Sequence, residues 1–141
     1  MPKQPQWQPI SRLPSMAQHI DGWLESVQEQ YQTLLPAKTK PHVLDDYTIN
    51  RVKKVFTEQQ NDLWLWDEQL SRWKSGNLTE AQRTEIERLQ RQMKKIREQI
   101  TDILALADDL AKGTIEKVMA KSDAELGLEF LLNPEKFRRD R

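Results

Sequence analysis

The chain of 141 residues contains no cysteine and only four glycines. The absence of cysteine excludes disulfides, thiolate zinc sites and cysteine nucleophiles. The glycines stand at positions 22, 76, 113 and 127, whereas phosphate-binding loops need glycines within about six residues of one another. Nucleotide binding through a P-loop or a dinucleotide-binding turn is therefore excluded.

Net charge and long hydrophobic runs are also missing. Basic and acidic side chains number 22 each, so there is no overall positive field to attract nucleic acid or anionic lipid. The longest aliphatic run of the long helical region, 103–107, is far shorter than the roughly 20 residues of a membrane-spanning helix. The first 14 residues lack the apolar core of a secretory signal. We therefore expect a cytoplasmic protein without a membrane span.

The N-terminal 14 residues, here called the arm, contain four prolines and are not expected to be helical. Their apolar residues Trp7, Ile10 and Leu13 are three apart. A polyproline II helix has three residues per turn, so these side chains would share one face. The pattern predicts either an arm that lies in a groove or a frayed terminus.

Three helices are predicted from hydrophobic spacing, over residues 15–35, 45–75 and 79–112. In each, apolar residues alternate three and four apart, which is the period of coiled-coil packing. Gly76 and Asn77 are expected to end the second helix with left-handed backbone. The predicted N-terminal caps are Ser15 with Gln18, Asp45 or Asp46, and Thr79 with Gln82.

The short turn between the second and third helices predicts that they run antiparallel. One offset, in which Leu63 faces Leu89, brings apolar residues together in every layer of the hairpin. The only polar residue in this seam of the second helix is Gln59, which we interpret as a register device rather than a ligand contact. The same offset predicts two flanking pairs, Asp67 with Arg83 and Lys53 with Arg97.

The predicted fold is all-α: a long antiparallel coiled-coil-like hairpin with a shorter N-terminal helix packed on it as a three-helix bundle. The single domain comprises the arm (1–14), the bundle (15–112), and short C-terminal helices with a charged tail (113–141) that pack on the bundle. Because the third helix outruns the second, it is expected to expose leucines to this C-terminal element. These are Leu104, Leu106 and Leu110.

Catalytic, cofactor-binding and metal-binding residues are not expected. His19 and His42 have no further ligand at metal-binding spacing. The carboxylate pairs 45–46 and 108–109 are adjacent on helices and point about 100° apart, so neither pair converges on one atom. The sequence therefore predicts a non-catalytic helical interaction or oligomerisation module, and a small-molecule enzyme or binder is only a third alternative.

The tryptophans indicate where such a module would bind. Trp64 and Leu65 lie off the hydrophobic seam of the second helix, so a partner or the first helix must cover them. We therefore predict a homodimer, or binding to another protein, through a surface formed by Trp23, Trp64, Leu65 and Trp7.

A local basic zone supports an alternative function. Between Glu87 and Glu98 the third helix has no acidic residue, and basic residues of the second helix are expected opposite this stretch. The zone could bind phosphates in a nucleic-acid-associated accessory protein, although no aromatic residue interleaves it for base stacking. Its predicted phosphate-binding residues are Arg51, Lys53, Lys54, Arg91, Lys94, Lys95 and Arg97.

Overall fold

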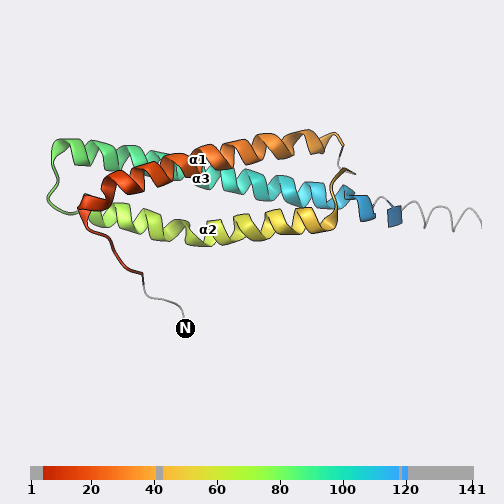
Figure 1. The fold of residues 1–141 in the computed structure, drawn as a ribbon, viewed down its shortest axis with the longest axis horizontal. Coiled ribbons are helices and arrows are strands. Elements are labelled where there is room, and N and C mark those ends of the chain that lie inside the picture. The colour runs from red at the N-terminus through yellow and green to blue at the C-terminus, as the bar shows by residue number, and fades with distance from the viewer. Residues whose placement is uncertain (1–4, 41–42, 118, 121–141) are drawn as a thin grey trace, which may run out of the picture.

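The computed structural model describes residues 5–40, 43–117 and 119–120. It contains three long helices, α1 (Leu13–Leu34), α2 (Asp46–Lys74) and α3 (Glu80–Leu110), and no strand in those ranges (Figure 1). The predicted all-α helical bundle is therefore confirmed. Short 3-10 helices flank the long ones: η1 (Ile10–Arg12), η2 (Leu35–Lys38) and η4 (Ala111–Gly113).

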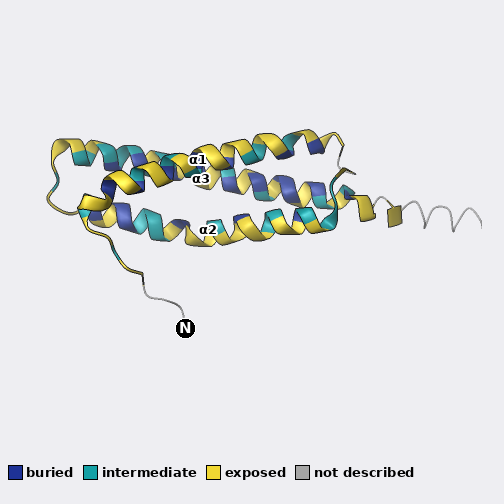
Figure 2. Cartoon of the chain, viewed as in Figure 1, coloured by how far each residue is buried: buried dark blue, intermediate teal, exposed yellow. Residues whose placement is uncertain are grey.

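Helix α3 is the centre of the arrangement. Both α1 and α2 pack along it, whereas α1 and α2 make hardly any close backbone approach to each other (Figure 1). Six large apolar residues of α3 have no exposed surface, and the buried faces of the three helices meet inside the bundle (Figure 2). Each such side chain contributes about 1.5–3 kcal/mol through burial. The six are Ile86, Leu89, Met93, Ile96, Ile100 and Ile103.

Two of the three predicted N-terminal helix caps are present in the structure. Asp45 caps α2 by accepting from the Thr48 backbone N–H, and Thr79 caps α3 in a reciprocal capping box with Gln82. The predicted cap at Ser15 is wrong, because α1 already begins at Leu13. The η1 turn leads directly into α1, whose first turn tolerates Pro14 because the N–H that proline lacks would have no helical partner there.

The end of α2 also differs from the prediction. No residue with positive φ occurs in the described ranges, so Gly76 and Asn77 do not provide a left-handed cap. Instead, Ser75 is the C-cap with right-handed backbone, and its N–H donates to the Ser71 carbonyl. The Gly76 N–H then donates to the Trp73 carbonyl. These bonds tighten the last turn and satisfy carbonyl groups that have no partner further along the helix.

The flanking ion pairs of the hairpin differ from those predicted. Asp67 pairs with Arg97 rather than Arg83, and Lys53 pairs with Asp108 at 2.9 Å. These partners lie 14 and 11 residues further along α3 than predicted, a distance of about 16–21 Å at 1.5 Å per residue, which is more than the two side chains can span. The predicted register, with Leu63 opposite Leu89, is therefore wrong: the hairpin is shifted along α3, and a shift by a whole heptad still brings apolar residues together in every layer.

The C-terminal end of α3 is covered differently from the prediction. Leu106 and Leu110 are buried and Leu104 is half-buried within the described part of the chain. The connection η2 packs against α3, with Ala37 buried. The prediction that α3 outruns α2 is wrong, because the Ile115 N–H just after α3 donates to the Leu44 carbonyl just before α2. The predicted helix and tail over 121–141 lie outside the described residues.

Candidate functional site

A groove of about 560 Å³ lies between α1 and α2, where these two helices do not pack backbone against backbone. We call it the aromatic groove. Two of its lining residues are titratable, the imidazole of His19 and the carboxylate of Asp62. The groove is lined by Gln18, His19, Gly22, Trp23 and Ser26 of α1 and by Gln59, Asp62 and Trp66 of α2.

Three aromatic rings bridge the two helices in this groove. His19 stacks on Trp66 with ring centroids 4.5 Å apart, and Trp23 meets Trp66 edge-on at 5.7 Å. The Trp23 indole N–H donates to the Gln59 side-chain oxygen over 2.7 Å. Gln59, interpreted from the sequence as a register device, is thus the acceptor that fixes the Trp23 ring. The rings are held in place before any ligand arrives.

Gly22 is exposed in the aromatic groove, and a Cβ atom built on it would meet nothing within 4 Å. Its φ is not positive, so the backbone does not require glycine either. A glycine inside a helix costs about 1 kcal/mol relative to alanine. Nothing in the described part of the chain explains this cost. Ser26, one turn further along α1, is another small residue in the same wall of the groove.

The arm crosses the end of α2 that is nearest the turn to α3 (Figure 1). The Gln8 backbone N–H donates to the Gln69 side-chain oxygen at 2.6 Å, and the Gln69 amide donates back to the Gln8 carbonyl at 3.4 Å. The same carbonyl accepts from the Trp73 indole N–H at 2.8 Å. Residues 5–9 of the arm thus lie against α2, one of the two predicted alternatives, whereas the prediction that residues 10–14 are not helical is wrong, because η1 and the start of α1 occupy them.

Trp7 anchors the arm beside a second hollow of about 260 Å³, and the Arg72 guanidinium lies 4.3 Å from the centre of its ring. This is a cation–π arrangement. Trp66 lines both this hollow and the aromatic groove, so the two are adjacent. We call the surface beneath the arm the arm site; it is formed by Met16, Leu65, Trp66, Gln69, Arg72 and Trp73.

The structure brings together three of the four residues predicted as the interaction surface. Trp23 lines the aromatic groove, and Trp7 and Leu65 line the hollow at the arm site. Trp64 is 55% exposed but lines neither. The sequence reasoning missed Gln69, a residue only 7% exposed. Its signal was a polar residue about one helical turn from both Trp66 and Trp73.

Helix α1 is fixed against α3 by a partly buried ion network. The Arg88 guanidinium donates two bonds to the Asp21 carboxylate, at 2.8 and 2.9 Å, and a third to Glu85. The bond from Arg88 is the main reason that the pKa of Asp21 lies below its ordinary value. Asp21 directly precedes Gly22 in the sequence, so the network holds the α1 wall of the aromatic groove in position.

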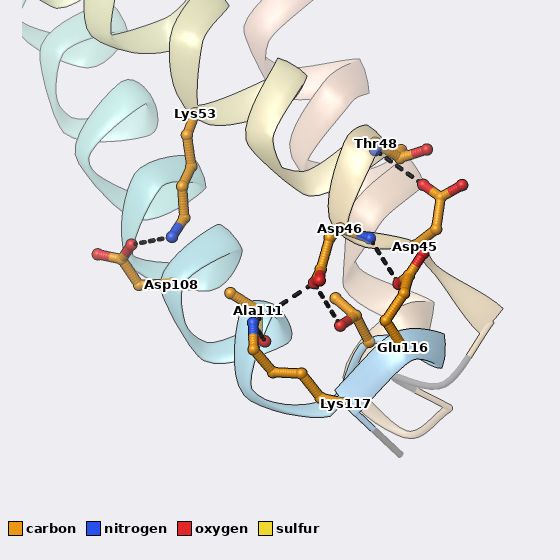
Figure 3. Close-up of polar contacts among 9 residues, drawn as sticks. Asp45, Asp46, Thr48, Lys53, Asp108, Ala111, Glu116 and Lys117 are labelled. Carbon is orange, nitrogen blue, oxygen red and sulfur yellow. Dashed lines mark hydrogen bonds and ion pairs between the residues drawn. The ribbon is translucent and has the colours of Figure 1, made fainter. Parts of the chain in front are cut away.

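The opposite end of the bundle carries a polar end cluster, formed by Asp45, Asp46, Thr48, Thr114, Glu116 and Lys117 (Figure 3). The buried Thr114 hydroxyl donates to Asp46 over 2.5 Å, and this bond lowers the pKa of the Asp46 carboxyl. Lys117 donates to Asp46 and to the Ala111 carbonyl. Bonds from Thr48 lower the pKa of Asp45. The cluster joins the start of α2 to the segment after α3.

The predicted basic zone is divided by ion pairs. Lys53 is bound to Asp108, about three helical turns beyond Arg97, and Arg97 itself is bound to Asp67. Arg91, Lys94 and Lys95 are exposed on α3, and Arg51 and Lys54 are exposed on α2. Lys53 thus contacts an acidic part of α3 rather than the basic stretch.

Other classes of site find little support in the described ranges. These ranges hold no group of three or more His, Cys, Asp or Glu side chains that could bind a metal ion. None of the helices described is long and apolar enough to cross a membrane.

Comparisons with protein-family models, curated proteins and solved structures returned no match.

Proposed function

We propose that this chain is a non-catalytic protein–protein interaction module that binds through the aromatic groove. One observation carries the proposal: α1 and α2 both pack on α3 but leave between them an open groove lined by aromatic rings. Aromatic residues are enriched at protein interfaces and provide much of their binding energy. The two lining groups that can titrate, His19 and Asp62, are too few for the convergent polar set of a catalytic site.

The groove is suited to binding because its rings are already ordered. The Trp23–Gln59 bond and the His19–Trp66 stack fix the aromatic side chains in the free chain. A partner would therefore lose little affinity to the ordering of these side chains. Gly22 adds open space beside the rings, where the backbone of a partner could approach closely. Such an approach would explain why a glycine that lowers helix stability stands at this position.

The charge on α1 constrains the partner. Over Leu13–Leu34 the helix carries no lysine or arginine, and besides Asp21, which is paired with Arg88, it carries Glu25 and Glu29. Asp62 of α2 adds another carboxylate to the groove wall. Complementary potentials favour the correct partner and speed association, so the matching surface should be neutral or basic. A second copy of the chain is the first partner to test, because its α3 exposes Arg91, Lys94 and Lys95.

The test is the mass in solution of the parent chain and of Gly22→Arg, which fills the groove and repels a basic partner. Gln28→Arg is the matched control, because Gln28 is exposed on α1 and does not line the groove. We expect a parent mass of about twice 16.7 kDa and a monomer for Gly22→Arg only. An equal loss of the dimer in Gln28→Arg would show a charge effect on α1 rather than binding through the groove.

A nucleic-acid-associated role is the second candidate, favoured by the exposed Arg91, Lys94 and Lys95 on one stretch of α3. Phosphate binding weakens steeply as salt increases, because bound counterions are released, whereas apolar association does not. Retention on nucleic acid at low salt, lost in Lys94→Glu with Lys95→Glu, would favour this role. Identical behaviour of the parent and this variant would exclude it.

A further inference from the structure

We infer that the arm site is a receptor for an extended peptide, and that residues 5–9 occupy it as a tethered ligand. The segment that the site takes from a partner is an extended stretch with a tryptophan flanked by prolines, the chemistry of the arm itself. The inference rests on the proposed function, since it names the segment through which a partner would bind next to the aromatic groove.

The arm site recognises backbone rather than a particular side chain. The contacts from Gln69 and Trp73 reach the N–H and the carbonyl of Gln8. The Gln8 side chain instead donates to the Gln6 carbonyl of the arm itself and is exposed. Any residue with a backbone N–H could take the place of Gln8. A donor and an acceptor directed at one residue are the means by which extended peptides are bound elsewhere in proteins.

Gln69 shows that the site is built for this contact. Gln69 is only 7% exposed, and both the oxygen and the nitrogen of its carboxamide form hydrogen bonds with the arm. Leaving a buried carboxamide without hydrogen-bond partners costs free energy. Occupation of the site by an extended backbone is therefore favoured. Trp73 is equally buried, and its indole N–H is directed to the same carbonyl.

The ligand chemistry follows from the arm. Pro9 has φ −69° and ψ 157°, which are polyproline II values. Prolines preorganise a segment in this conformation and reduce the entropy lost on binding. Trp7 supplies the anchor, with its ring against Arg72 and beside Leu65. A partner segment therefore needs an aromatic anchor, a following residue with a free N–H, and flanking prolines.

The receptor surface belongs to the bundle and not to the arm, because all six residues of the arm site lie on α1 or α2. Release of the arm would leave that surface in place. A short tether gives the arm an effective concentration in the millimolar range, so it competes strongly with a free peptide. The parent chain should accordingly bind such a peptide far more weakly than a variant whose arm cannot dock.

The experiment uses the full chain with Trp7→Ala and Gln8→Pro, which removes the anchor ring and the donating N–H of the arm. A labelled synthetic peptide with the sequence of residues 1–10 is the probe, and fluorescence anisotropy measures its binding. We expect this release variant to bind the peptide about tenfold or more tightly than the parent does. Adding Gln69→Leu should abolish binding, and a control peptide with Trp7→Ala should bind at least about tenfold more weakly.

Two results would overturn the inference: a folded release variant that does not bind the peptide at millimolar concentration, or binding that Gln69→Leu leaves unchanged. If the release variant does not fold, a spin-labelled form of the peptide is titrated into Trp7→Ala alone, whose arm lacks its anchor ring but keeps the Gln8 N–H. Broadening of the Trp73 indole N–H resonance supports the inference, and its absence overturns it. A parent dimer that Gln69→Leu dissociates would assign the site to the arm of a second copy and overturn a separate partner segment.

The failure of this inference is distinguishable from that of the proposed function. Gly22→Arg should change the mass in solution and leave peptide binding intact, because Gly22 lines the aromatic groove and not the arm site. Gln69→Leu should do the reverse. Loss of one effect alone therefore identifies which of the two proposals is wrong.

Discussion

The two halves of the bundle use their polar and aromatic residues in opposite ways. In the polar end cluster, charged side chains are paired within the chain: Asp46 is bonded to Thr114 and Lys117, and nearby Lys53 pairs with Asp108 (Figure 3). Toward the turn between α2 and α3, ordered aromatic rings line an open groove. The polar end cluster therefore holds elements of the fold together, whereas the aromatic groove is left open.

Acid should produce the largest effect, because three carboxylates act together and two of them belong to the polar end cluster. The pKa values of Asp21, Asp45 and Asp46 lie below the ordinary value of 3.8 in the folded chain. A lowered pKa stabilises the fold above the ordinary value, and that stability is lost as pH falls through the lowered one. Urea unfolding at a series of pH values should show constant stability down to about pH 4 and a steep loss below it.

The Asp46→Asn variant sharpens this prediction. It removes one of the three titrating groups, so its stability should decrease less steeply with acid than that of the parent. An identical pH dependence in the two proteins would show that the polar end cluster does not contribute to acid unfolding.

Thr114→Val should be the most damaging single substitution among these predictions. Thr114 is fully buried, and its hydroxyl donates to Asp46. Loss of a buried hydrogen bond costs about 1–3 kcal/mol, which chemical unfolding would measure. The matched control is Thr101→Val, because the exposed Thr101 hydroxyl bonds only to the Arg97 carbonyl of its own helix. Equal losses in the two variants would contradict a special role for Thr114.

Gly22→Ala should act in the opposite direction and stabilise the chain. The added Cβ meets open space, and alanine is favoured over glycine within a helix by about 1 kcal/mol. Thermal and chemical unfolding of the monomer would measure the gain. A destabilised variant would mean that the glycine serves packing inside the chain, and the case for a free groove would weaken.

The Lys53–Asp108 pair should show the smallest effect. The Asp108 side chain is 72% exposed, and exposed ion pairs contribute at most about 1 kcal/mol. A double-mutant cycle with Lys53→Met and Asp108→Asn should give a coupling free energy below that value. A larger coupling would place this pair among the main stabilising contacts at this end of the bundle.

Much of the fold could be predicted from residue spacing alone. Alternation of apolar residues three and four apart identified all three helices, and the Thr79–Gln82 capping box marked the start of α3 correctly. These signals are local, so they depend on neighbours in the sequence. The flanking pairs of the hairpin could not be predicted in the same way, because apolar residues three and four apart fit equally well after a shift by a whole heptad, so the spacing does not fix the register of α2 against α3.

The candidate site was only partly predictable. The tryptophans directed attention to Trp7, Trp23 and the neighbouring Leu65, which the structure places in two adjacent hollows. The contacts of Gln69 with the arm join residues 61 positions apart in the chain, and no local pattern encodes such a contact. The separation of α1 from α2 was equally invisible, because a hydrophobic stripe shows that a helix packs but not which neighbour it avoids.

The most direct test of the central claim, that the aromatic groove is the working surface, is sedimentation equilibrium of Gly22→Arg and Trp64→Glu beside the parent chain. Trp64 is exposed but does not line the groove, so it provides an aromatic comparison. We predict that Gly22→Arg sediments at 16.7 kDa while Trp64→Glu keeps the dimeric mass of the parent. A dimeric Gly22→Arg with a monomeric Trp64→Glu would contradict the account.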